Sequence, residues 1–246
     1  MALSQNFARL AHYSPRGVDP DDPGQVLAMP LVLRIEKSTP PDRAALLEAA
    51  AQASIAACLD PRAEPGGEWA ETFDAWCAGR IRKIARRARG ASWAAVQELP
   101  GVTAQVGAAQ ARALVPGPVG RADRRVTKLQ IEGTDIAGEL PAAPRADGRG
   151  ARLCLWTAPD LAMTVGKLAA QVGHAAMLGA ELVPPDAAPR WVEDGCPVQV
   201  CQADRRRWAQ LLAAAEHGRA AVVRDAGYTE IAPGSVTVIA EALPAE

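Results

Sequence analysis

The chain has 246 residues, of which 49% are apolar and 22% are charged. This composition excludes a largely disordered protein and allows one large domain or two small ones. The formal net charge of −1 carries no signature of nucleic-acid binding.

The predicted elements begin after an irregular N-terminal segment, residues 1–24, whose second half is interrupted by Pro and Gly. A first block, residues 25–136, starts with an apolar strand at 31–34 and continues with a helix at 43–59. Residues 137–150 are rich in Ala, Pro and Gly and are predicted to be a linker.

The second block, residues 151–246, also alternates apolar strands with helices. An apolar strand is predicted at 153–156, and residues at helical spacing follow from about Thr164. The remaining predicted elements are a strand at 198–201, a helix at 204–217, and strands at 220–224 and 236–240. This alternation indicates α/β architecture, with a sheet covered by helices.

The two blocks carry similar features in the same order, at a spacing of roughly 115–120 residues. The matched features are Trp76 and Trp191, Trp93 and Trp208, and Pro116-Gly117 and Pro233-Gly234. Any one of these matches is weak, but their shared order favours a tandem duplication of one small α/β domain.

A possible catalytic face lies on the helix that starts near Thr164. Lys167, Gln171 and His174 share one side of it, and Gly166 would let a ligand approach the backbone closely. A lysine is unfavourable in a first helical turn unless the site binds an anion or a developing oxyanion. On the pattern alone, a solvated face of an amphipathic helix remains the simpler alternative.

A carboxylate and two hydroxyls follow the strand at 220–224. Asp225 comes directly after this strand, where loops of α/β sheets often hold ligands. It is a candidate for orienting or deprotonating water, and Thr229 and Ser235 are candidate donors to a phosphate or sugar. The alternative is that Asp225 caps a turn and that Pro233-Gly234 shapes the next one.

Several segments of the second block, taken together, resemble the type 2 peptidyl-tRNA hydrolase family over about residues 152–242. They are Asp160–Met163, Gly166-Lys167, Ala169–Gln171, His174-Ala175, Asp225–Gly227 with Thr229, and Ile231–Ser235. The resemblance implies a mixed four-stranded sheet between helices, usually assembled as a homodimer. It also implies cleavage of the ester that joins a peptide to the 3′ ribose of tRNA.

The resemblance assigns functional positions to this sequence. Lys167, His174 and Asp225 would be catalytic, and Gly166, Gln171, Thr229 and, more weakly, Ser235 would bind substrate. We expect Asp225 to position or activate water and Lys167 to stabilise the oxyanion or a nearby phosphate. His174 and Thr229 would orient the ester and the terminal ribose. No metal and no cofactor is expected, because the sequence has no cluster of metal ligands.

This chain departs from the family where cations are usual. Ala158, Val165 and Tyr228 stand at three such positions, and Glu230 replaces a common glutamine. RNA affinity depends heavily on neutralised phosphates, so these departures leave open whether the second block binds tRNA. Two alternatives to a peptidyl-tRNA hydrolase therefore stay open: a non-catalytic RNA-binding or regulatory protein, and a hydrolase of another acyl ester.

The first block is predicted to be a degenerate copy without catalysis. If Gln52 matches Gln171, then Glu48 and Ile55 replace the lysine and the histidine; the proline-glycine match puts Ala108 and Arg112 at the aspartate and threonine positions. Such a copy would supply the dimer-like partner surface within one chain, a pseudo-dimer that would be monomeric as a chain. Its basic cluster would contact the tRNA backbone, or would be a solvated helix face; it comprises Arg80, Arg82, Lys83, Arg86, Arg87 and Arg89.

The remaining expectations concern compartment and redox state. The start of the sequence lacks a secretory signal pattern, and no uncharged apolar run reaches the roughly 18–20 residues that cross a bilayer. The five cysteines match no zinc spacing, and Cys154 and Cys201 lie in apolar strands, where they would be reduced core residues. A cytoplasmic protein with no membrane contact is therefore expected.

Overall fold

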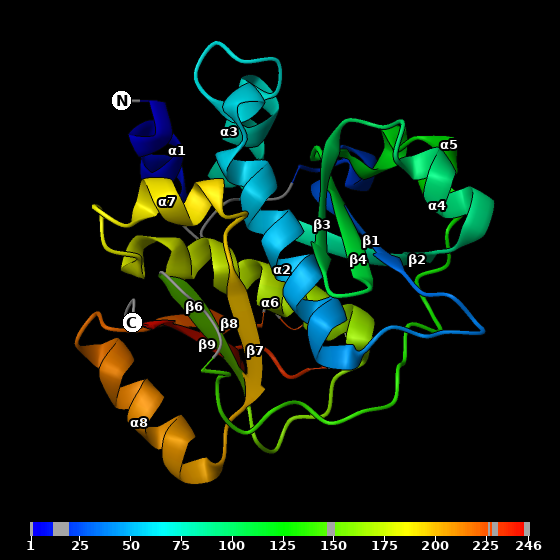
Figure 1. Cartoon of the computed structure of the whole chain (residues 1–246). Coiled ribbons are helices and arrows are strands. Elements are labelled where there is room, and N and C mark those ends of the chain that lie inside the picture. The colour runs from blue at the N-terminus through cyan, green and yellow to red at the C-terminus, as the bar shows by residue number, and fades with distance from the viewer. Residues whose placement is uncertain (1, 12–19, 147–150, 226, 228–230, 244–246) are drawn as a thin grey trace.

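The computed structural model describes residues 2–11, 20–146, 151–225, 227 and 231–243. It has α/β architecture, with two mixed sheets flanked by helices (Figure 1). Figure 1 shows the layers from one end of the molecule to the other: helix α8, the second sheet, the helices α6 and α2, the first sheet, and the helices α4 and α5.

The second sheet has the strand order β7-β6-β9-β8. Its strands are β6 (Arg152–Thr157), β7 (Val198–Gln202), β8 (Ala221–Arg224) and β9 (Val236–Leu243). β6 is parallel to β7, whereas β9 is antiparallel to both β6 and β8. Every residue of β6 is buried, because helices cover both faces of this sheet.

Three helices belong to this block: α6 (Val165–Gly179), α7 (Ala188–Glu193) and α8 (Arg205–Glu216). Leu153 and Leu155 of β6 share a core with α6, while Cys154 and Trp156 of the same strand pack with Leu211 of α8. The alternation of side chains along a strand thus serves two cores at once. Cys154 and Cys201 are free and buried, as predicted.

The first sheet repeats this arrangement, with the order β2-β1-β4-β3. Its strands are β1 (Leu27–Arg34), β2 (Arg82–Ala88), β3 (Gly101–Val106) and β4 (Ala109–Leu114), and a two-residue strand, β5 (Gly117–Pro118), pairs with β1 outside this order. β1 is parallel to β2, and β4 is antiparallel to β1 and β3. Four helices complete the block: α2 (Arg43–Leu59), α3 (Ala70–Ala78), α4 (Gly90–Val96) and α5 (Arg124–Thr127). Equal strand order and directions are consistent with a duplicated domain.

The two blocks meet through α2 and α6, which pack against each other. Each of these helices also contacts the edge strand of the other block, α2 with β7 and α6 with β2. The contact is close: a Cβ at Gly173 of α6 would lie 2.8 Å from Oγ of Ser54 on α2. One hydrophobic core therefore extends through both blocks, and this explains why α2 is apolar on nearly all sides.

A buried carboxylate, paired with a partly exposed arginine, also joins the blocks. Glu48 of α2 is fully buried, accepts a hydrogen bond from the backbone N–H of Val200 at 3.2 Å, and pairs with Arg145 at 2.8 Å. Arg145 belongs to the predicted linker, and residues of its described part bond to the outer edge of β7: Gln202 N–H donates to the carbonyl of Pro141, and Arg145 N–H donates to Gln199 Oε1, each at 2.8 Å. The edge strand β7 is thus covered by α2 and by the linker.

The N-terminal segment differs from the prediction, because Ala2–Ala11 forms a helix, α1. Pro and Gly interrupt only the later part of residues 1–24, and residues 2–11 contain neither. Leu10 is buried in the shared core, and Arg9 donates to the carbonyl of Ala63 at 2.7 Å and pairs with Asp74 at 2.6 Å. Tertiary contacts therefore stabilise this short helix.

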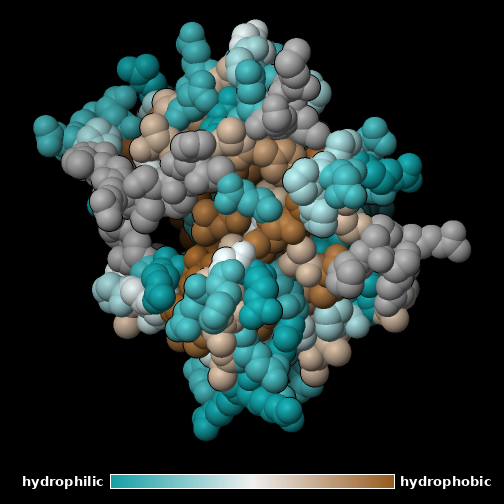
Figure 2. Space-filling model, turned by 90° about the vertical axis from the view of Figure 1, so that its left-hand side faces the viewer, coloured by the Kyte–Doolittle hydropathy of each residue, from teal (hydrophilic) through white to brown (hydrophobic). Residues whose placement is uncertain are grey.

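On the face that carries α1, α7 and α8, hydrophobic residues form a middle band with hydrophilic residues above and below it (Figure 2). In the described part of the chain, no helix is long and apolar enough to cross a membrane.

Candidate active site

The N-terminus of α6 and the hairpin between β8 and β9 bring the predicted catalytic groups together. Thr164 caps α6, because its hydroxyl accepts a hydrogen bond from Lys167 N at 3.3 Å. Asp225 comes directly after β8, and its N–H donates to the carbonyl of Ser235 at 2.9 Å. Its own carbonyl accepts from Gly234 N at 2.7 Å. Backbone hydrogen bonds thus fix the carboxylate at the strand end.

Lys167 and Asp225 form a buried ion pair through Oδ2 of the carboxylate, with side chains 14% and 3% exposed. Gln171 donates to the same oxygen at 2.6 Å, and Gly227 N donates to Oδ1 at 2.8 Å. Thr237 of β9 donates to Gln171 Oε1 at 3.0 Å, which turns the amide nitrogen toward Asp225. The carboxylate is therefore held by three donors on two elements.

His174 lies about one turn beyond Gln171 on α6, and the side chain that contacts it, Lys83, belongs to the first block. Lys83 of β2 approaches His174 Nδ1 at 3.2 Å and Met177 Sδ at 2.9 Å, with its ammonium 4.9 Å from the centre of the Trp76 ring. We call this contact the Lys83–His174 pair. It lies on the same helix face as the Lys167–Asp225 pair but joins the two blocks.

Burial and nearby charges determine the protonation states of Lys83 and His174. Burial, assisted by the charges of Lys83 and Lys167, lowers the pKa of His174 well below its ordinary value. Burial also lowers the pKa of Lys83, to about 8. At neutral pH Lys83 is thus mostly an ammonium that donates to Nδ1 of a neutral imidazole, so the imidazole proton resides on Nε2. His174 can therefore donate a hydrogen bond from Nε2.

Gly166 has a different neighbour from the expected ligand. Its N–H donates to Oγ1 of Thr134 at 3.0 Å, and a Cβ at Gly166 would lie 2.8 Å from that oxygen. Thr134 is buried and belongs to the segment that leaves the first block. The absence of a side chain at Gly166 thus accommodates Thr134, and a role of this glycine in binding substrate stays a prediction.

Comparison with known proteins identifies the second block. A family model described as "Peptidyl-tRNA hydrolase PTH2" matches residues 151–245. A peptidyl-tRNA hydrolase of Haloquadratum walsbyi is 42% identical over 84 residues, which cover 33% of this chain and 75% of that protein. The chain belongs to the peptidyl-tRNA hydrolase PTH2 family.

Two further relatives carry similar names. A peptidyl-tRNA hydrolase of Thermococcus onnurineus is 35% identical over 89 residues, 33% of this chain and 74% of that protein. The probable peptidyl-tRNA hydrolase 2 of Schizosaccharomyces pombe is 38% identical over 106 residues, 41% of this chain. The chain spans about half, 51%, of the length of this yeast relative. The PTH2 match includes Lys167, His174 and Asp225, whereas Lys83 and Thr134 lie outside it.

Two of the departures from the PTH2 pattern lie in the interior. Ala158 and Val165 are 6% and 1% exposed, and Val165 belongs to the core shared by the two blocks. Small and apolar residues suit these surroundings, because a cation there would be buried. Tyr228, Thr229 and Glu230 lie outside the described residues. Ser235 is half-buried, and its carbonyl anchors Asp225.

One predicted alternative for the basic cluster of the first block was a solvated helix face. This alternative is wrong, because most of the cluster lies on strand β2. Side chains alternate along a strand, so the cations are divided between the two faces of the sheet. Lys83 faces α6, Arg86 donates to the carbonyl of Leu129 at 2.9 Å, and Arg87 bonds to the side chain of Gln130. The carbonyl of Arg82 accepts from Trp76 Nε1 at 3.1 Å.

The proline-glycine match between the blocks is wrong. Pro116-Gly117 follows β4, and Gly117–Pro118 forms the short strand β5 beside β1, whereas Pro233-Gly234 precedes β9. Arg112 consequently lies inside β4, where it donates to Thr103 Oγ1 at 2.8 Å, and does not occupy a loop. Ala108 lies in the tight turn between β3 and β4. This turn replaces the longer loop that carries Asp225 in the second block.

Sequence reasoning missed Thr237 and Thr134, and it gave Lys83 a different partner. A threonine inside the apolar run of β9 was a usable signal, because a buried hydroxyl needs a hydrogen-bond partner. No sequence signal connects Lys83 with His174 across the two blocks. Within the described ranges, no three His, Cys, Asp or Glu side chains gather in a way that could hold a metal ion.

Proposed function

We propose that this chain hydrolyses the ester between the peptide and the 3′ ribose of peptidyl-tRNA, with the Lys167–Asp225 pair as its centre. The observation that carries the proposal is the buried pair itself, held by Gln171 and Thr237 at the end of a sheet. A buried ion pair contributes little net stability compared with apolar packing. Its presence in the matched part of the chain therefore favours a chemical role.

In the proposed reaction, Asp225 positions a water molecule and takes up its proton as the water attacks the ester carbonyl. Lys167 stabilises the negative charge that develops on the carbonyl oxygen, or a neighbouring phosphate. As the bond between the carbonyl carbon and the ribose oxygen breaks, Asp225 passes this proton to the ribose oxygen, which leaves as the 3′ hydroxyl. The peptide is formed as a carboxylic acid, which loses its proton to water and leaves as the carboxylate. Gln171 acts through Asp225, since its amide restricts the carboxylate to one orientation.

The neighbouring groups orient the substrate in this proposal. Neutral His174 offers its Nε2–H to the ester or to the terminal ribose, and the hydroxyls of Thr229 and Ser235 serve as further donors. Lys83 acts as a positioning residue, because its contact with Nδ1 selects the tautomer of His174. The first block thereby contributes to the site of the second block.

We further infer that the first block is a degenerate copy that takes the place of a second subunit. This inference is supported by the equal strand orders, by the packing of α2 against α6, and by the contacts of each helix with the other edge strand. In this arrangement Gln52, Glu48 and Ile55 of α2 serve packing, since Glu48 and Ile55 are fully buried. The chain would then act as a monomeric pseudo-dimer in the cytoplasm.

Incubation of the purified protein with peptidyl-tRNA and aminoacyl-tRNA, followed by measurement of released tRNA, tests the proposal. Release from peptidyl-tRNA that is lost in Lys167→Met and Asp225→Asn supports it. Binding of tRNA without release from either substrate would establish the non-catalytic RNA-binding alternative. Equal turnover of simple acyl esters and of peptidyl-tRNA would point to a hydrolase of another ester.

A further inference from the structure

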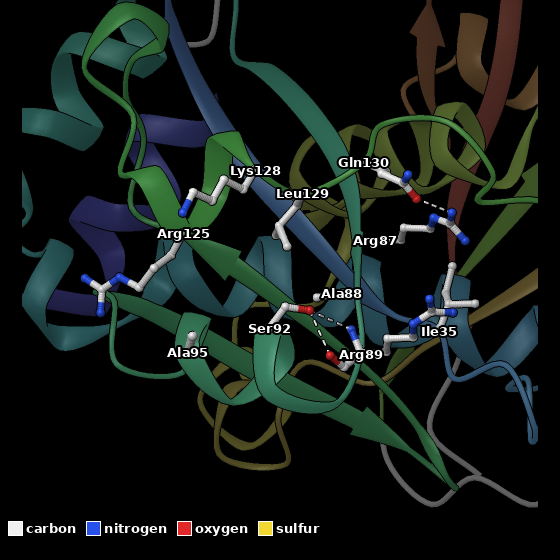
Figure 3. A pocket seen from close by; sticks show the side chains of 10 residues that line it. All are labelled: Ile35, Arg87, Ala88, Arg89, Ser92, Ala95, Arg125, Lys128, Leu129 and Gln130. Atoms are coloured by element: carbon white, nitrogen blue, oxygen red, sulfur yellow. Dashed lines mark hydrogen bonds between the residues drawn. The ribbon is translucent and has the colours of Figure 1, made fainter.

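A basic cavity lies on the first block, next to the strand β2. Its volume is about 450 Å³. Four cations and two neutral polar side chains line it, together with apolar side chains; the polar residues are Arg87, Arg89, Ser92, Arg125, Lys128 and Gln130. None of the ten lining residues is a carboxylate. Figure 3 shows Arg87 and Arg89 on one side of the cavity and Arg125 and Lys128 on the other.

The charges of this cavity are only partly neutralised. Arg125 pairs with Asp123 and with Glu98, at 3.0 and 2.9 Å. Among the described residues the side chain of Arg87 bonds only the neutral amide of Gln130, and Lys128 is exposed. Arg89 is also exposed, and its charge is partly balanced by the nearby carboxylate of Glu36. The cavity therefore offers a local positive potential on a chain whose net charge is −1.

The cavity is connected to the start of α6 by a short segment. Gln130 lines the cavity, and four residues later Thr134 bonds to Gly166 at the N-terminus of α6. A fully extended stretch of four residues spans at most about 14 Å. In between, Gly133 lies against the guanidinium of Arg87: a Cβ at Gly133 would be 3.2 Å from Cζ. The cavity is thus within a few nucleotides' reach of Lys167.

We propose that this cavity binds backbone phosphates of the tRNA whose 3′ ester lies at the Lys167–Asp225 pair. The proposal rests on the proposed function. Long, exposed cations recognise phosphates without reading sequence, and none of the ten lining residues is aromatic, so the site has no platform for base stacking. The cavity would supply the cations that the second block lacks at Ala158 and Val165.

The proposal is tested with the double charge reversal Arg89→Glu and Lys128→Glu, two exposed residues outside the hydrolytic centre. The control with the same change in net charge is Arg206→Glu with Arg219→Glu, because Arg206 is exposed on α8, Arg219 is exposed just after it, and α8 lies at the other end of the molecule. Binding of uncharged tRNA is measured against salt concentration. Turnover is measured on full-length peptidyl-tRNA and on a peptidyl ester of the 3′-terminal nucleotides alone.

We expect the double variant to bind tRNA about tenfold or more weakly at moderate salt, with a salt slope reduced by about 2. KM for peptidyl-tRNA should rise, kcat should remain, and turnover of the short ester should not change. Thermal unfolding should be unchanged; if it is not, Arg89→Gln with Lys128→Gln removes the charge with less perturbation.

The outcomes separate the two proposals. If the variant with Arg89→Glu and Lys128→Glu binds tRNA with the wild-type affinity and salt slope, the phosphate site is overturned, whatever the turnover assays show. Saturable binding of inorganic phosphate that depends on Arg89 and Lys128, without any effect on tRNA, would overturn it in favour of a small-anion site. Absence of turnover of both substrates by the wild-type protein would refute the hydrolase, while the binding results would still decide the cavity.

Discussion

Replacement of Glu48 tests the physical link between the two blocks. This carboxylate is fully buried, accepts from Val200 N at 3.2 Å, and takes two contacts from Arg145, at 2.9 and 2.8 Å. Glu48→Ala removes a charge-assisted hydrogen bond, worth about 1.5–3 kcal/mol. It also leaves the N–H of Val200 without an acceptor, at a cost of about 1–3 kcal/mol.

The Arg145 side chain is 42% exposed, so water replaces part of its lost interaction. We therefore expect Glu48→Ala to lower the free energy of unfolding by about 3 kcal/mol, toward the lower end of the sum of the lost hydrogen bond and the unsatisfied N–H. Glu48→Gln retains an oxygen for Val200 N–H and is expected to cost about 1–2 kcal/mol. Because neither change touches the Lys167–Asp225 pair, turnover by the folded variants should be unaffected.

Urea denaturation of the three proteins at neutral pH measures these values, from the midpoint and slope of each transition. The order wild type, Glu48→Gln, Glu48→Ala is the essential result. A loss below about 1 kcal/mol for the alanine variant, or equal losses for both variants, would refute the reasoning that this contact stabilises the junction.

The other predictions concern the proposed catalytic pair Lys167–Asp225, the protonation of His174, and the packing of α2 against α6. Lys167→Met and Asp225→Asn should each reduce peptidyl-tRNA turnover by about 100-fold or more. In urea denaturation, Lys167→Met alone should lower the free energy of unfolding by about 3–5 kcal/mol, because it leaves a buried carboxylate without its counter-ion. Adding Asp225→Asn to this variant should restore part of the lost free energy. By NMR, His174 should protonate well below pH 6.5, and Lys83→Met should raise its pKa; titration of His174 between pH 6 and 7 in the wild type would contradict this. Below about pH 6.5 histidine takes up a proton in the unfolded chain, whereas His174 in the folded protein stays neutral. The free energy of unfolding should therefore fall as the pH drops below about 6.5. Gly173→Ala should cost about 1–3 kcal/mol by overpacking the contact with α2, and an unchanged urea midpoint would refute that contact.

Local sequence patterns predicted the second block well. The strand expected at 153–156 is Arg152–Thr157, and the helix expected at 204–217 is Arg205–Glu216. The face formed by Lys167 and Gln171 follows from helical periodicity, and the position of Asp225 follows from the end of a strand. The structure brings these three residues together, while their catalytic roles remain a prediction.

The errors arose where contacts are distant in sequence or signals are short. The Lys83–His174 pair joins residues 91 positions apart in different blocks, so no local pattern could reveal it. The proline-glycine match depended on two residues, and the tight turn at Ala108 shows that the loop between the last two strands differs in length between the blocks. Residues 2–11 form a helix because of tertiary contacts that propensity alone does not report.

The packing of α2 against α6 also bears on how activity depends on protein concentration. In a homodimer, the surface that completes each site is lost when the protein is diluted. If the first block takes the place of a second subunit, as we propose, the partner surface is tethered in the same chain and its effective concentration does not depend on how much protein is present. Two tandem copies would also be free to diverge: Glu48 on one central helix and Lys167 on the other need not satisfy the same environment. Activity per molecule should therefore be constant down to very dilute solution.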